Sequence, residues 1–274
     1  MFDGPPKFAW IGDAKFKNLG TETDQDRAIL ASFGVAVARA ALGGLTPSPD
    51  LRPTSAQDLR DAILQSSGHV GMGELLTFCW AFGIPVLNVT VFPLGQKRMH
   101  AMTVRVATRY TILIGRESSF PAQIAYVVAH EIAHVLLRHV SDNTALLEMG
   151  DPLISTQPDE EEAEADRFAL ALLTGYERPE ILAEHDRFSA RQLAQAALDA
   201  GPQHRIDPGV LALCVGHSTG RWARSFSALK LIPDGTADVR ASINKLAASQ
   251  LDWGSMSREN QDYLRKVLGS AHGP

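Results

Sequence analysis

Hydrophobic and polar positions follow a helical period at both ends of the chain and a strand-like pattern in the middle. Before residue 85 the pattern predicts three helices, over about 24–41, 56–65 and 73–82. Thr23 or Asp24 is suited to cap the first helix, and Ser55, with Asp58 three residues later, is suited to cap the second. Residues 1–20 are rich in Gly, Pro and Lys and are predicted to be irregular.

The period changes after residue 85. Short segments rich in β-branched residues predict three strands of a small antiparallel sheet, over 86–92, 102–108 and 110–114. Pro121 opens a long helix that extends to about Val140, because proline is favoured in a first helical turn. Further helices are predicted over 159–173 and, interrupted at breaks such as Gly201-Pro202, over 189–268. The predicted fold class is α+β.

Composition places the chain among ordinary globular proteins. Its 274 residues are 45% hydrophobic and 21% charged, which excludes a disordered chain, a collagen-like repeat and a disulfide scaffold. The formal net charge of −5 argues against broad attraction to nucleic acid. The basic residues Arg221, Arg224 and Lys230 are better explained as one solvated helix face.

The two cysteines and the N-terminus bear on the compartment. Cys79 and Cys214 lie in apolar runs and are predicted to be buried hydrophobic residues, which suits a reducing compartment; a disulfide between them is the alternative. The first residues show no basic segment followed by an apolar run, so no secretory signal is predicted. We expect a cytoplasmic protein without a membrane span.

Residues His130-Glu131-Ile132-Ala133-His134 form the pattern H-E-x-x-H inside the long predicted helix. Positions i and i+4 share one helix face, so the two imidazoles can bind one zinc ion. Glu131 beside them is suited to act as a general base. The flanking residues are apolar on every side, which predicts a buried helix. Three polar side chains buried there are costly unless a metal or other partners compensate them.

The third ligand is predicted to be a carboxylate of the next helix, since neither cysteine is near in sequence. That helix offers six candidates, which are Asp159, Glu160, Glu161, Glu162, Glu164 and Asp166. Glu162 and Asp166 lie along the edge of the apolar stripe, whereas Glu160 and Glu164 point away. Glu162 is the favoured ligand, although Glu161 also falls near the stripe. Asp166 is placed to accept the free ring N–H of a ligating histidine or to pair with a nearby arginine.

Two segments together resemble the ImmA/IrrE family of metallopeptidases. The first segment is the run His130–His139, and the second begins at Glu162. The second matches the family form E-x-x-A-[ND]-x-F-A at Glu162, Ala165, Asp166, Phe168 and Ala169. The resemblance covers roughly residues 70–175. It implies a gluzincin-like core at 70–175, a helical extension at 1–69, and a helical region at 176–274 packed on the core.

The resemblance also implies a function. Members are zinc endopeptidases, often of stress-response systems or mobile elements, that cleave or inactivate a helix-turn-helix repressor. We expect zinc held by His130, His134 and Glu162, catalysis by Glu131, and such a repressor on a separate chain as partner, with no direct binding of nucleic acid or membrane. A strand before the long helix is expected to offer an edge to the substrate.

Two questions stay open at this point. The donor that stabilises the oxyanion is not identified, and the candidates are Tyr126, His139, Tyr176, His185 and His217. The alternative function is a non-hydrolytic zinc-binding regulator that acts by protein–protein binding, although such a protein would not need Glu131.

Overall fold

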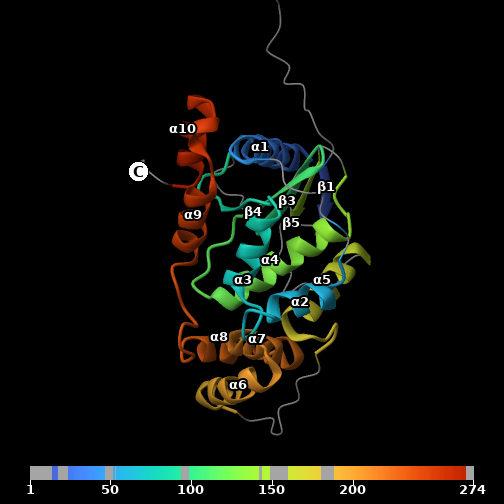
Figure 1. The fold of residues 1–274 in the computed structure, drawn as a ribbon. Helices are drawn as coiled ribbons and strands as arrows, with labels where there is room; N and C mark the ends of the chain where they lie inside the picture. Colours follow the sequence, from blue (N-terminus) through green and yellow to red (C-terminus); the bar gives the residue numbers. More distant parts are fainter. Residues whose placement is uncertain are drawn as a thin grey trace, which may run out of the picture.

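The computed structural model describes residues 14–17, 24–46, 52, 54–93, 99–141, 144–148, 160–179 and 188–269 (Figure 1). The first half contains β1 (Ala14–Lys17), α1 (Asp24–Gly43), α2 (Ala56–Leu64), α3 (Met72–Ala81), β2 (Val86–Asn88), β3 (Ala101–Val106), β4 (Arg109–Ile114) and α4 (Pro121–Leu136). The second half contains β5 (Ala145–Glu148), α5 (Glu160–Thr174), α6 (Ala190–His204), α7 (Pro208–Thr219), α8 (Trp222–Leu229), α9 (Val239–Gln250), the 3-10 turn η2 (Trp253–Ser255) and α10 (Arg258–Val267). The α+β class predicted from the sequence is confirmed.

The five strands of the described residues form one sheet in the order β1-β5-β3-β4-β2. β3 pairs antiparallel with β4, as predicted, and also with β5. β2 was predicted as a strand of the antiparallel sheet but pairs parallel with β4, and β1 pairs parallel with β5. β1 and β5 were not expected, and β1 lies within the segment predicted to be irregular. Each has only four residues, too few to show an alternating pattern.

The sheet lies between α1 on one side and α4 on the other (Figure 1), and it separates two clusters of buried hydrophobic residues. Along β4, Ile112 and Ile114 belong to the core cluster that includes α4 and α5, whereas Leu113 belongs to the cluster that includes α1 and α10. Alternate side chains of a strand point to opposite faces, so β4 supplies both cores. Helix α1 lies close to β3 at Gly34. Even a Cβ atom there would collide with the side chain of Met102.

The ends of the predicted helices are largely as expected. Ser55 caps α2, since its Oγ accepts a hydrogen bond from the Asp58 N–H at 3.1 Å. Thr23 lies outside the described residues, and α1 begins at Asp24. Helix α6 runs through Gly201-Pro202, where a break was predicted; a proline in the last turn removes only one helical hydrogen bond near an end.

Helix α4 begins at Pro121 but ends at Leu136, four residues before the predicted end. Arg138 adopts a left-handed conformation with φ of 62°, which turns the chain back on the helix. The His139 N–H then donates to the His134 carbonyl at 3.0 Å. The early end of α4 therefore brings His139 next to the H-E-x-x-H segment.

Both cysteines are buried free thiols, as predicted for hydrophobic core residues. Burial raises the pKa of the Cys79 thiol well above its usual value. None of the described helices is both long enough and apolar enough to cross a bilayer. The three segments predicted as extension, core and helical region remain predictions.

Arg60 of α2 holds the end of the helix that follows the metal-binding motif. Its side chain is 4% exposed, and its guanidinium donates to the carbonyls of Leu172 and Leu173 at 3.0 and 2.8 Å. It also donates to the Arg205 carbonyl at 2.7 Å, at the end of α6. Burial lowers the pKa of Arg60. The last carbonyls of a helix have no partner within it, so Arg60 compensates the carbonyls of Leu172 and Leu173, two fully buried residues in the last turn of α5.

Replacing Arg60 with Met should therefore reduce the free energy of unfolding by about 3 kcal/mol, because several carbonyls lose a charged donor. Urea unfolding followed by circular dichroism measures the change. The matched control is Arg240→Met on the exposed face of α9, which should change stability by less than about 0.5 kcal/mol. Equal stability of the two variants would contradict this role of Arg60.

Candidate metal centre

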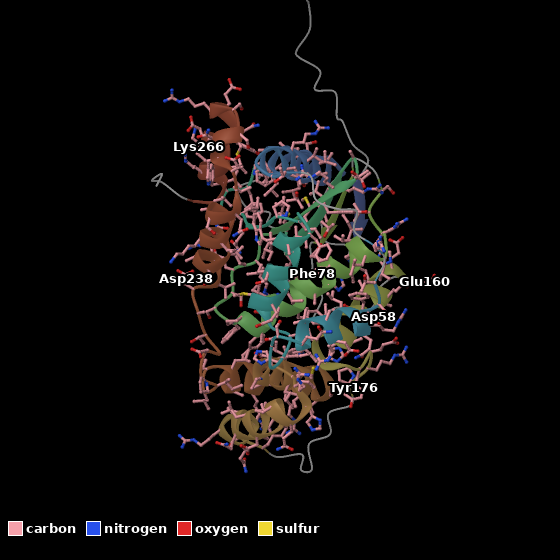
Figure 2. The ribbon with its side chains drawn as sticks, viewed as in Figure 1. Asp58, Phe78, Glu160, Tyr176, Asp238 and Lys266 are labelled. Carbon is pink, nitrogen blue, oxygen red and sulfur yellow. The ribbon has the colours of Figure 1, made fainter. Side chains whose placement is uncertain are left out.

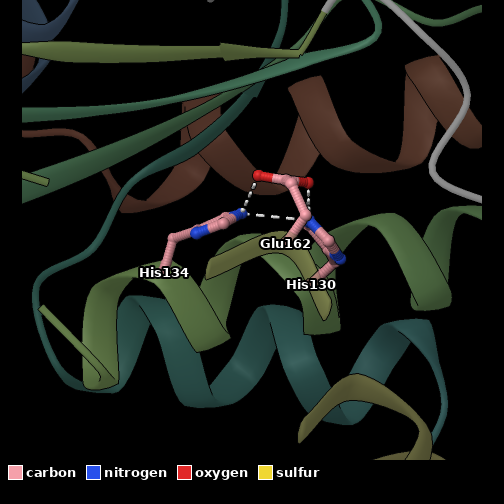
Figure 3. A group of neighbouring side chains, drawn as sticks. All are labelled: His130, His134 and Glu162. Atoms are coloured by element: carbon pink, nitrogen blue, oxygen red, sulfur yellow. Dashed lines mark hydrogen bonds and ion pairs between the residues drawn. The ribbon is translucent and has the colours of Figure 1, made fainter. Parts of the chain in front are cut away.

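Helices α4 and α5 bring three metal-ligand side chains to one point (Figure 3). His130 and His134 lie one turn apart on α4, and Glu162 lies in the first turn of α5. The Nε2 atoms of the histidines are 3.0 Å apart. Glu162 Oε2 lies 3.1 Å from His130 Nε2, and Glu162 Oε1 lies 3.4 Å from His134 Nε2.

The donor set fits a small tetrahedral metal ion. Ligand atoms about 2.0–2.2 Å from a tetrahedral zinc are about 3.3–3.6 Å apart, close to the separations of these three donors. The histidines are 0% exposed and Glu162 is 6% exposed. A cation bound between the two ring nitrogens and the carboxylate would compensate all three buried groups. The group could therefore hold a metal ion, and nitrogen with carboxylate ligands suits zinc.

A carboxylate and a phenol lie behind His130. Asp166 Oδ1 is 2.9 Å from His130 Nδ1, the nitrogen that faces away from Glu162. The Tyr126 hydroxyl donates to the same oxygen at 2.6 Å. Asp166 is one turn after Glu162, and of the two partners left open by the sequence, a ligating histidine or a nearby arginine, the structure places it next to the histidine. A carboxylate there favours the tautomer that keeps Nε2 available for a metal.

A second pair of side chains lies behind His134. The Nδ1 atoms of His134 and His139 are 2.9 Å apart, and His139 Nε2 is 3.1 Å from Glu164 Oε2. A neutral imidazole has one N–H donor and one acceptor nitrogen, so one assignment of protons satisfies both contacts. In it, His134 Nδ1–H donates to His139 Nδ1, and His139 Nε2–H donates to Glu164. The sequence reasoning missed this pair, because it assumed a helix to Val140 and directed Glu164 outward. The spacing of His139 from His134 was the available signal.

Glu131 points from α4 toward the sheet. Its carboxylate is 0% exposed, and its Oε2 accepts a hydrogen bond from the hydroxyl of Thr103 on β3. Alternate strand positions face the same side, so Thr103 is the polar residue of β3 directed at α4 between apolar Met102 and Val104, which face α1. The hydroxyl therefore fixes one oxygen of the Glu131 carboxylate.

Helix α5 buries its apolar face against the core, and this orientation turns Glu162, at the edge of that face, toward His130 and His134. The predicted stripe is buried, and its members are Ala165, Phe168, Ala169, Leu172 and Leu173. Glu160 and Tyr176 lie near the two ends of this helix (Figure 2). Glu160 is exposed, and Glu161 is half-buried outside the three-donor group. Asp159 lies outside the described residues.

The side chains considered as oxyanion donors lie in different places. Tyr126 and His139 support the two metal-site histidines from behind. Tyr176 is 61% exposed after the end of α5, and His217 is exposed at the end of α7. His185 lies outside the described residues.

Comparison with known proteins gives one family match. Residues 85–197 match the Peptidase_M78 family model, described as the IrrE N-terminal-like domain. The match begins just before β2 and ends within α6, so it contains every residue of the centre described above. No match was found among curated proteins or solved structures. Residues 85–197 of this chain therefore resemble the IrrE N-terminal-like domain, in agreement with the ImmA/IrrE resemblance of the two sequence motifs.

Proposed function

We propose that the protein is a zinc-dependent endopeptidase. The observation that carries the proposal is the convergence of the donor atoms of His130, His134 and Glu162, with the Glu131 carboxylate on the same helix. Zinc in this position would supply a Lewis acid and lower the pKa of a bound water toward about 7. The match of residues 85–197 to a peptidase family supports hydrolysis of peptide bonds.

The side chains of the centre take distinct roles in this proposal. Glu131 accepts a proton from the attacking water and delivers it to the leaving amine, while Thr103 keeps its carboxylate oriented. Asp166 holds the ring of His130, and His139 holds the ring of His134. The buried surroundings strengthen each of these contacts, because the local dielectric constant is low.

The burial of the centre bears on its substrate. The two histidines, Glu131 and Glu162 are at most 6% exposed, so a peptide must displace covering residues to reach them. β3 is paired on both sides, with β5 and β4, so the expected substrate-binding edge on a strand before the long helix cannot be β3; β1 and β2 are the edge strands of the described sheet. A selected protein substrate fits such a closed site better than unselected peptides. A helix-turn-helix repressor on a separate chain remains the proposed partner.

Metal content tests the three donors. Purified untagged protein should contain about one zinc per chain by mass spectrometry, and Glu162→Ala should lose most of it because a three-donor site loses its only carboxylate. Glu160→Ala is the matched control, since Glu160 lies in the same helical turn but is exposed. Full zinc retention in Glu162→Ala would argue against the proposed ligand set.

The supports behind the histidines should tune zinc affinity. Asp166→Asn and His139→Ala should each weaken zinc binding by about 10- to 100-fold, because the ring they hold loses its fixed tautomer. Competition with a chromophoric chelator measures the affinity. Asp199→Asn on the exposed face of α6 should leave it unchanged. Unaltered affinity in both test variants would remove these residues from the proposed site.

Hydrolysis is tested with Glu131→Gln. This variant should keep its zinc but cleave at least about 100-fold more slowly, because the amide cannot accept the proton. New N-termini in a native cell lysate, labelled chemically and identified by mass spectrometry, report cleavage. Glu259→Gln on the exposed face of α10 is the control. Zinc-loaded wild-type protein that yields no more new N-termini than Glu131→Gln would favour the non-hydrolytic regulator.

A further inference from the structure

A cavity of about 400 Å³ lies beside the metal centre, between α4, α5 and α7. Its walls are mainly apolar and include Ala122, Leu170, Val210, Leu213 and Cys214. Burial raises the pKa of the Cys214 thiol to about 12, so this side chain is a neutral part of the wall. A mainly apolar cavity of this size suits a small organic molecule.

The polar residues of the cavity carry more free positive than free negative charge. Arg167 and Arg178 line it, and neither forms an ion pair or hydrogen bond within the described part of the chain. Of the two carboxylates that line it, Asp166 is already engaged by His130 and Tyr126, which leaves Glu177. Guanidinium groups bind carboxylates and similar anions through paired N–H donors. An anionic head group on an apolar body is therefore the matching ligand.

The cavity also reaches the supports of the metal centre. Tyr126 and Asp166 are part of its wall, and Asp166 Oδ1 lies 2.9 Å from His130 Nδ1. A ligand that fills the cavity displaces water from the Tyr126–Asp166 contact. Excluding water strengthens electrostatic contacts, so the hold of Asp166 on the His130 ring becomes firmer.

We propose that this cavity is a binding site for a small anionic molecule with an apolar body, and that its occupation tightens metal binding at His130. Binding itself is independent of the proposed peptidase activity. The cavity is formed by the folded chain itself, so the anion should also bind to metal-free protein and to Glu131→Gln. The effect on metal affinity rests on the proposed ligand role of His130.

Binding is tested by calorimetry with four anions of suitable size, which are octanoate, decanoate, 4-phenylbutyrate and 1-naphthoate. At least one should bind metal-free protein with a Kd of about 1 mM or tighter, as expected for ligands of this size. The matched amine, such as 4-phenylbutylamine for 4-phenylbutyrate, should bind at least about tenfold more weakly, because the cationic head meets Arg167 and Arg178. Failure of all four anions to bind, or equal binding of the amine, overturns the proposal.

Two pairs of variants test whether the anion binds in this cavity. Leu170→Trp fills the cavity and should abolish binding, whereas Leu198→Trp, on a half-buried position of α6 outside it, should not. Arg178→Gln should remove most of the preference for the anion over the amine, whereas Arg240→Gln should keep it. Arg178 is exposed, so its replacement leaves the fold intact and the test valid even if Leu170→Trp is unstable. Binding unaffected by both test variants would show that the ligand lies elsewhere.

The coupling has its own readout. A saturating amount of the binding anion should lower the zinc Kd of wild-type protein several-fold in a chelator competition. It should leave the zinc Kd of Leu170→Trp unchanged. Anion binding without a change in zinc affinity would retain the site but overturn the coupling, and neither result depends on whether the protein cleaves a substrate.

Discussion

Helices α4 and α5 pack so that the ionisable side chains buried on one helix are compensated by those of the other. Helix α4 carries two histidines and a glutamate in a segment that is otherwise apolar on every side and fully buried. Ionisable groups in such a place must be compensated, and α5 provides the compensation through Glu162 and Asp166. Arg60 holds the far end of α5 at its carbonyls, so the position of these carboxylates depends on α2 as well.

The supports of the two histidines are different in kind. His130 is held by a carboxylate and a phenol that also line a cavity, whereas His134 is held by His139 and, through it, by a half-exposed glutamate. Both arrangements leave Nε2 as the donor that faces Glu162. The side of His130 thus connects the metal centre to a space where a ligand can bind, and that of His134 connects it to the surface at Glu164.

The proposed reaction and the closed centre are compatible if access is selective. The Glu131 carboxylate is held by Thr103, the donor set is buried, and β3 is paired with β5. Such a site is arranged for chemistry but is closed to unselected peptides. The match of residues 85–197 to a peptidase family supports the proposed class of reaction. The helices outside the matched segment pack on both faces of the sheet and are part of the same core clusters.

Local sequence patterns predicted the fold class, the long helix beginning at Pro121, the apolar face of α5 and the pair of His130 and His134, because helical periodicity and ligand spacing are local properties. The patterns favoured Glu162 but left Glu161 as an alternative, and the structure brings Glu162 to the two histidines. Tertiary structure sets the parallel pairing of β1 with β5 and of β2 with β4, the formation of β5 and the support of His134 by His139. β1 and β5 have four residues each and carry too little pattern to be recognised, and the direction in which β2 pairs is not encoded in its own residues. The left-handed turn occurs at Arg138, where the sequence has no glycine to indicate it. The direction of the His139 side chain is therefore known only from the packing around α4.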